Sequence, residues 1–406
     1  MIKNNFFLKI FFSALFIFSL IKLYDNSINR DAWQYGEWLI NYQHGFVRRG
    51  LFGEFIYLIS KIFSNNIQIS FFLVLSILCF FYYYLNYYLI KNVKFNFIFF
   101  LIIFSPLFYL FFVVISKVGI KKEILLYIFY LFYLIFLSSK YFTLSKNWLF
   151  IFCFPFLLFN HEAAFFYFPY LIFPILLVVE KKNFKYVAFQ IISSLMISCV
   201  FMIFLYSYKG SPDHVVNICR SLVNYAPVKC DWWGPIFALS HDLFINIDGK
   251  KNLFFYLSVD FKTLIGFMFY IFYGFIPLFL FLKFVTINSK SIVLSSRLIF
   301  LIMFTAFVFS MPLFHIAEDW SRWFSIHFHM MAFLIFFLEK IKLLNFENNF
   351  QFNQIEVFFK KGNLKKFFII FLFIYATFFH HHHFFFKDVK LEFTYFKIFK
   401  KINSNF

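Results

Sequence analysis

The chain has 406 residues, of which 62% are hydrophobic and only 14% are charged. Soluble domains are about 45–50% apolar and about 25% charged, so this composition excludes a soluble globular protein. The formal net charge of +19 would suggest a nucleic-acid partner in a soluble chain. In an apolar chain it is better explained by membrane topology, and no nucleic-acid partner is expected.

Long apolar stretches recur along the whole chain, many of them close to the ~20 residues that a helix needs to cross about 30 Å of hydrocarbon. They predict an all-α, polytopic integral membrane protein, a single transmembrane domain over residues 1–406 with about 11 (roughly 10–12) transmembrane helices. The predicted helices are 6–24, 68–90, 95–116, 124–139, 147–159, 163–179, 186–207, 261–282, 298–314, 323–338 and 367–386.

Basic residues are shared unequally between the two sides of these helices. With a cytoplasmic N-terminus, the inner segments carry a net charge of +14 and the outer segments, without the tail after residue 386, carry +2. This asymmetry follows the positive-inside rule. It places two outer loops, residues 25–67 and the enlarged loop 208–260, on the same face.

The first outer loop combines carboxylates, adjacent arginines, glycines and an amphipathic segment. The guanidinium forks of Arg48 and Arg49 suit bidentate phosphate binding, and the nearby glycines would let backbone N–H groups approach an anion. Asp31 and Glu37 are the candidate catalytic carboxylates. The alternative is an interfacial amphipathic helix with Trp anchors and snorkelling arginines.

Two further outer turns carry charged side chains. Lys121 and Lys122 lie on the side where lysine is disfavoured, which favours an anionic ligand or, equally, lipid headgroups. Residues 160–162 interrupt the apolar stretch 147–179, and because a mid-membrane charge costs about 2.5–3.5 kcal/mol, two short helices joined by an outer turn are predicted. His161 and Glu162 in this turn suit proton transfer or ligand orientation, with a structural turn as the alternative.

Acidic, arginine and tryptophan residues recur at Asp319 and Arg322, and the enlarged loop adds Trp232 and Trp233. The candidate catalytic residues are therefore Asp31, Glu37, His161 and Glu162. The candidate phosphate- or substrate-binding residues are Arg48, Arg49, Arg322, Lys121, Lys122, Asp319, Trp232 and Trp233.

The five cysteines form no metal-binding spacing, and no metal or other cofactor is expected. Cys219 and Cys230 lie in the enlarged outer loop, where an oxidising compartment would favour a disulfide worth about 3 kcal/mol in the chain-entropy model. The run of histidines at 380–383 lies in an apolar segment with no acidic or cysteine partner. It is therefore not assigned to a metal site.

Three segments carry a resemblance to known proteins: residues 45–51 (GFVRRGL), 160–162 (NHE) and 319–323 (DWSRW). They resemble recurring motifs of bacterial multi-pass surface-polysaccharide proteins, chiefly O-antigen polymerases and, more loosely, GT-C glycosyltransferases. GT-C enzymes carry an acidic residue in the first outer loop, which Asp31 or Glu37 would match. Polymerases rely instead on arginines and histidines of the outer loops.

The resemblance implies transfer or polymerisation of saccharide units on an undecaprenyl-phosphate type lipid, at the periplasmic face of the bacterial inner membrane, as in O-antigen, lipopolysaccharide or capsule assembly. The implied partners are the polyprenyl-phosphate-linked saccharide, membrane lipids, and a chain-length regulator or other polysaccharide-assembly proteins. The alternatives are a flippase or transporter for lipid-linked saccharides and a non-catalytic membrane assembly protein. Transporters usually place charged groups at the membrane midplane, which these apolar stretches largely lack.

Overall fold

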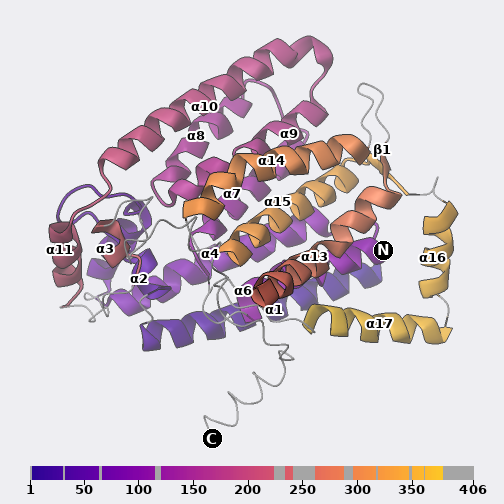
Figure 1. The fold of residues 1–406 in the computed structure, drawn as a ribbon, viewed down its shortest axis with the longest axis horizontal. Coiled ribbons are helices and arrows are strands. Elements are labelled where there is room, and N and C mark those ends of the chain that lie inside the picture. The colour runs from indigo at the N-terminus through magenta and orange to yellow at the C-terminus, as the bar shows by residue number, and fades with distance from the viewer. Residues whose placement is uncertain are drawn as a thin grey trace, which may run out of the picture.

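The computed structural model describes residues 2–30, 33–63, 66–114, 120–223, 234–240, 261–287, 296–316, 319–346, 350–360 and 362–377. They form an almost entirely helical structure (Figure 1), which confirms the all-α prediction. The α-helices are α1 (Ile2–Asn29), α2 (Tyr35–Trp38), α3 (Leu51–Ile62), α4 (Ile67–Ile90), α5 (Phe97–Ile103), α6 (Tyr109–Val114), α7 (Glu123–Leu137), α8 (Asn147–Leu158), α9 (Pro169–Val178), α10 (Phe184–Ser207), α11 (Pro212–Val223), α13 (Phe261–Phe284), α14 (Ser296–Ile316), α15 (Trp320–Lys340), α16 (Phe350–Lys360) and α17 (Gly362–Thr377).

Short elements complete the described structure. The 3₁₀ helices are η1 (Glu162–Tyr167), η2 (Lys181–Asn183) and η3 (Phe237–Ser240). Strands β1 (Thr286–Ile287) and β2 (Leu344–Asn345) pair antiparallel, with Thr286 opposite Asn345.

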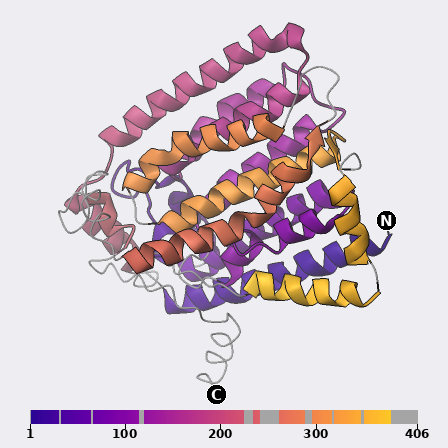
Figure 2. The same cartoon turned by 45° about the vertical axis from the view of Figure 1, so that its right-hand side comes forward.

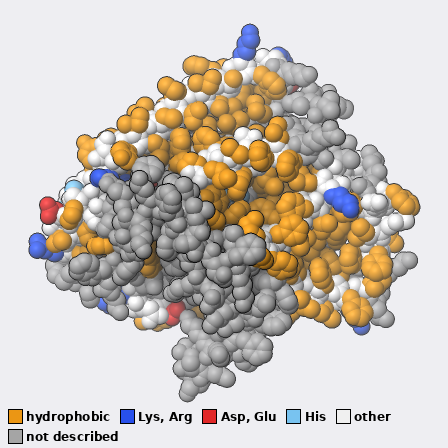
Figure 3. All heavy atoms as spheres, in the orientation of Figure 1, with side chains coloured by type: hydrophobic (Ala, Val, Ile, Leu, Met, Phe, Trp, Pro, Cys, Tyr) orange, Lys and Arg blue, Asp and Glu red, His pale blue; other side chains and the backbone are white. Residues whose placement is uncertain are grey.

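The apolar helices are typical of a polytopic membrane protein. Among the described residues, α1, α4, α10 and α15 are long and apolar enough to cross a membrane, and shorter apolar helices accompany them. Large apolar side chains of α10 face outward, with Phe189 61% and Ile203 69% exposed. Hydrophobic side chains also cover most of the described surface that is visible in Figure 3, as expected of a surface in contact with hydrocarbon. The number of spans stays a prediction.

The centre of the bundle is α15, whose most apolar window is 94% buried. Helices α4, α7, α13 and α14 pack around it, and Figures 1 and 2 show α13 and α14 flanking α15 while α10 lies at the periphery. Helices α2, α3 and α11 gather at one end of the bundle, and the N-terminus, β1 and α16 lie at the other. The loops that carry the predicted site residues belong to the first of these ends.

The prediction of one helix over residues 95–116 is wrong. Helix α5 ends at Ile103 and α6 begins only at Tyr109. Pro106 lies between them, and proline both lacks an N–H and disfavours the helical conformation of the residue before it. The Ser105 hydroxyl donates instead to the Gly274 carbonyl of α13 at 2.8 Å, so the break is held by a neighbouring helix.

Close chain packing holds residues 40–42 against the start of α3. A Cβ atom at Gly53 would lie 1.7 Å from the Ile40 carbonyl oxygen, and one at Gly50 would lie 2.1 Å from the Tyr42 ring. The Glu54 carboxylate accepts the Tyr42 N–H at 2.8 Å and fixes the same turn. The sequence suggested that the glycines let backbone N–H groups approach an anion. In the structure, Gly50 and Gly53 instead allow residues of the same chain to approach closely.

We expect Gly53→Ala to lower the free energy of unfolding by about 1–3 kcal/mol, the usual cost of overpacking a filled interior. The backbone of Ile40 has to move, because the new methyl group meets a carbonyl oxygen rather than a flexible side chain. Thermal unfolding of the detergent-purified protein measures the effect. The control is Leu51→Ala on the half-exposed side of α3, and equal midpoints for the two variants would contradict the prediction.

Candidate functional site

Five segments of the chain meet at the end of the bundle that carries α2, α3 and α11. They are α2, the turn at residues 48–49, the start of α7, the turn at residues 160–162 and the start of α15. Their charged or titratable side chains form what we term the charged cluster: Glu37, Arg48, Arg49, Lys121, Lys122, Glu123, His161, Glu162, Asp319 and Arg322.

Glu162 accepts hydrogen bonds from two arginines at once. Arg48 Nη1 lies 3.1 Å from its Oε1 atom, while Arg49 reaches both oxygens, with Nη2 2.5 Å from Oε1 and Nε 2.9 Å from Oε2. The remaining N–H groups of Arg48 donate to the Lys209 and Ala238 carbonyls, each at 3.2 Å. Arg48 therefore ties the first outer loop to the segments on both sides of α11.

The backbone at Arg49 adopts a conformation that side chains rarely take. Its φ angle is 65°, in the left-handed region that costs a non-glycine residue roughly 1–2 kcal/mol. The Lys122 ammonium donates to the Arg49 carbonyl at 2.5 Å and holds this turn. Burial lowers the pKa of Lys122 to about 7, although the neighbouring Glu37 opposes the shift.

A second group of charges surrounds Arg322. Its guanidinium forms ion pairs with Glu123, with Asp319 at 3.0 Å and with Glu37 at 3.4 Å. Lys121 Nζ lies 3.8 Å from the other oxygen of Glu37, which has no hydrogen-bond partner among the described residues. Burial alone would raise the pKa of Glu37, but the charges of Lys121 and Arg322 lower it to about 2.

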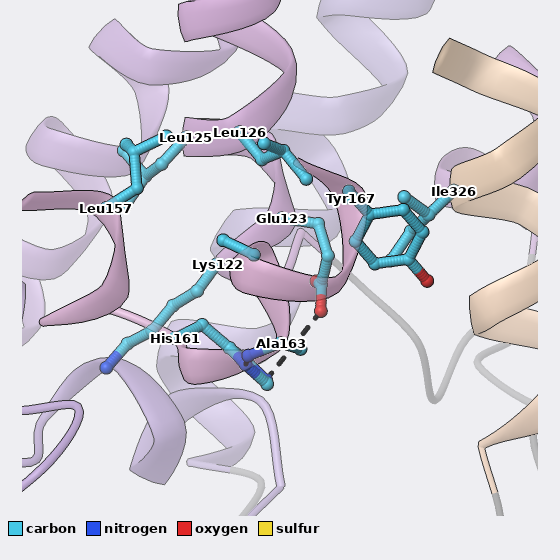
Figure 4. Close-up of a pocket in the computed structure, with 10 residues that line it drawn as sticks. Lys122, Glu123, Leu125, Leu126, Leu157, His161, Ala163, Tyr167 and Ile326 are labelled. Atoms are coloured by element: carbon cyan, nitrogen blue, oxygen red, sulfur yellow. Dashed lines mark hydrogen bonds and ion pairs between the residues drawn. The ribbon is translucent and has the colours of Figure 1, made fainter. Parts of the chain in front are cut away.

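His161 lies between these two groups. Its Nδ1 atom accepts the Ala163 N–H at 3.1 Å and caps η1, and its Nε2 atom lies 3.4 Å from Arg322 Nη2, a group that can only donate. Nε2 lies 3.7 Å from Glu37 and 3.9 Å from Glu123, and in Figure 4 the Glu123 carboxylate points toward this ring. Burial and the charge of Arg49 lower the pKa of His161 well below 6.5.

The described part of the site is closed. A cavity of about 10 Å³ lies beside Lys122, Glu123, His161 and Tyr167 (Figure 4), about the smallest volume that holds one water molecule. The side chain of Arg49 is 20% exposed, whereas those of Arg48, Glu37 and Arg322 are at most 6% exposed. Arg49 is therefore the cluster arginine that solvent reaches most easily.

Most of the side chains predicted from the sequence meet in the charged cluster. Glu123 was missed, although it directly follows Lys121 and Lys122 in a turn that the sequence had marked as unusual. The break predicted at residues 160–162 is confirmed, since α8 ends at Leu158 and η1 begins at Glu162. The predicted residues that lie outside the described part of the chain are Asp31, Trp232, Trp233 and Cys230.

The cysteines divide into two groups. Cys219 is disulfide-bonded, whereas Cys79, Cys153 and Cys199 are free thiols. The pairing of Cys219 with Cys230 stays a prediction. Within the ranges that the structure describes, no group of three or more His, Cys, Asp and Glu side chains is arranged to hold a metal ion.

Glu162 should matter more to stability than either arginine that it binds. Glu162→Gln leaves two buried guanidinium groups without their anion and should cost about 3–5 kcal/mol, whereas Arg49→Gln leaves Glu162 paired with Arg48 and should cost less. Thermal unfolding of the purified variants gives the order. Glu180→Gln, which removes a solvent-exposed pair with Lys182, serves as the control. A smaller loss for Glu162→Gln than for Arg49→Gln would refute the pairing.

The lowered pKa of Lys122 predicts how stability depends on pH. The folded chain releases the Lys122 proton near pH 7 and the unfolded chain near its ordinary value of 10.5. Between these values the unfolded chain binds more protons, so the contribution of Lys122 to the free energy of unfolding rises with pH. The difference in thermal midpoint between the native protein and Lys122→Met should rise across this window. A pH-independent difference would contradict burial of an uncharged lysine.

Comparison with protein families, curated proteins and solved structures finds no match to this chain. The resemblance to known proteins is therefore limited to the three short motifs. What the chain does has to be argued from the charged cluster itself.

Proposed function

We propose that the chain transfers or polymerises saccharide units carried on an undecaprenyl-phosphate type lipid, at the outer, periplasmic face of a bacterial inner membrane. The observation that supports this is the charged cluster, in which five cationic side chains and four carboxylates surround His161 at one end of an apolar helical body. Glycosyl transfer from such a lipid needs both kinds of group. Cations stabilise the leaving phosphate, and a carboxylate accepts the proton of the acceptor hydroxyl.

The arginines are proposed to hold the donor phosphate. Arg48, Arg49 and Arg322 are now paired with carboxylates of the protein, so a phosphate has to compete with those carboxylates for the same N–H groups. A diphosphate offers more charge and more acceptor oxygens than one carboxylate. Arg49, the most exposed of the three, is the expected first contact.

Glu37 is the candidate base that the described geometry favours. Both oxygens of Glu162 accept from arginines, and both ring nitrogens of His161 lie at N–H donors, whereas one Glu37 oxygen has no hydrogen-bond partner within the described part of the chain. The pKa of Glu37 is held at about 2 by neighbouring cations. A donor phosphate that neutralises Lys121 and Arg322 would raise this pKa and make Glu37 a stronger base at the moment of transfer. Asp31 remains the second candidate.

The alternatives make different use of the same residues. A flippase for lipid-linked saccharides would be expected to place charged groups at the membrane midplane, whereas α4, α8 and α9 contain no charged residue. A non-catalytic assembly protein would use the cluster only to lock its outer loops. A chain-length regulator or another polysaccharide-assembly protein is a proposed partner under either reading.

The decisive comparison is between two carboxylates of the first outer loop. Glu37→Gln should reduce saccharide transfer per folded molecule by about 10²- to 10⁴-fold, the usual contribution of a general base. Because Glu37 also pairs with the buried Lys121 and Arg322, activity is normalised to the folded fraction of each variant. Glu54→Gln is the matched control, because Glu54 bonds to Tyr42 and Gln43 of its own loop. The assay is mass spectrometry of products formed by the purified protein from undecaprenyl-diphosphate-linked saccharide.

The outcomes of this assay distinguish a transferase, a flippase and a non-catalytic assembly protein. Movement of the donor across vesicle membranes without new product would indicate a flippase, and no product with the native protein and all acceptors would indicate an assembly role. Arg48→Lys adds a finer test, because lysine keeps the charge and loses the fork. Near-complete loss of transfer would indicate bidentate recognition of the phosphate, and partial activity would indicate charge neutralisation.

A further inference from the structure

A deep apolar groove opens between α13 and α14 on the hydrophobic face of the bundle. Its volume is about 260 Å³, whereas about 10–15 Å³ is enough to hold one water molecule. Half of its wall faces outward: Phe272 on α13 is 58% exposed and Phe304 on α14 is 54% exposed. Helix α15 forms the floor. The residues that define the groove are Met268, Phe272, Met303, Phe307, Phe324 and His327.

The polar residue of the groove, His327, turns both ring nitrogens to the protein. Its Nδ1 atom lies 2.9 Å from the Tyr170 hydroxyl and its Nε2 atom 2.7 Å from the Ser310 hydroxyl. Ser310 donates in turn to the Phe307 carbonyl at 2.8 Å, so the three side chains satisfy one another. The groove therefore presents ring faces and methionines, a surface that selects hydrocarbon over any polar group.

The groove adjoins the charged cluster. The ring of Tyr167 lies 5.1 Å from that of His327 at the groove floor, and the same tyrosine lines the small cavity beside Glu123 and His161. Along α15, His327 follows Arg322 by five residues, a rise of roughly 7.5 Å. One aromatic side chain thus separates an apolar groove open to the bilayer from a set of buried cations.

We propose that this groove binds the hydrocarbon chain of a polyprenyl phosphate whose phosphate lies at the charged cluster. The inference rests on the proposed function and adds where the lipid carrier lies and that it enters from the bilayer between α13 and α14. A polyprenyl phosphate has a single chain, which matches a single groove, whereas a phospholipid has two. The isoprenoid methyl groups pack against the phenylalanine rings of the walls.

The test measures how affinity depends on chain length. Purified full-length protein is titrated with geranyl, farnesyl and geranylgeranyl phosphate, and binding is read by native mass spectrometry. Affinity should rise with each isoprene unit in the native protein. Met303→Trp fills the groove and should weaken the binding of geranylgeranyl phosphate at least about tenfold, the loss expected when about two CH₂ groups are no longer buried. The same variant should also reduce the dependence of affinity on chain length.

Three controls make the result specific. Val308→Trp adds the same ring on an exposed position of α14 outside the groove and should leave the chain-length dependence intact. Met268→Trp fills the opposite wall and replaces Met303→Trp if that variant does not fold. Arg322→Gln should weaken the binding of all three prenyl phosphates by a similar factor, because it removes a contact with the phosphate group that they share.

Two outcomes would overturn the proposal. Unchanged chain-length dependence in both groove-filling variants would show that the chain binds elsewhere. Equal competition by dioleoyl phosphatidylglycerol would show that the groove is an ordinary lipid contact. Failure of the proposed function looks different: the chain-length dependence would persist in the native protein while no saccharide was transferred.

Discussion

The ion pairs of Glu162 with Arg48 and Arg49 are the interaction on which this end of the molecule depends. A guanidinium group can be buried only with an anion beside it, and here one carboxylate serves two of them. Because Arg48 also donates to the carbonyls of Lys209, before α11, and Ala238, in η3, the pairing brings together segments that lie more than 100 residues apart in sequence. The charges around Arg322 can then be buried as well, since the same loops exclude water from both groups.

The membrane helices could be predicted because hydrocarbon allows so few alternatives to a helix. An apolar window of sufficient length is therefore informative, as it was for α4 and α10. The prediction failed where local backbone chemistry acts against composition, at Pro106. It expected an amphipathic segment within residues 25–67 without the bounds of α3, and it omitted α11 and α16. All three are helices of 11 or 12 residues without a long apolar window. Their ends are determined by contacts with other segments, which a single sequence does not reveal.

The sequence predicted most residues of the charged cluster but not which of them form ion pairs with one another. Charged residues next to apolar helices stand out in the sequence, and this found Glu37, Arg322 and His161. That Glu162 accepts from Arg49 is a contact across 113 residues, and nothing local encodes it. The sequence therefore suggested arginines that are free to bind a phosphate, whereas the structure shows arginines that already form ion pairs with carboxylates. Any anionic ligand of this cluster has to exchange partners with the protein, and its affinity depends on what the released carboxylates bind next.

The turn before α3 contains two residues with left-handed backbone conformations, Gly45 at φ 105° and Arg49 at φ 65°. At the first position the chain uses glycine, which adopts such angles without strain. At the second it keeps a bulky cation. Glycine at position 49 would relax the backbone by roughly 1–2 kcal/mol and lose the guanidinium. Arginine at this position combines a strained backbone conformation with the ion pair to Glu162, so a substitution that relaxes the turn also removes that ion pair.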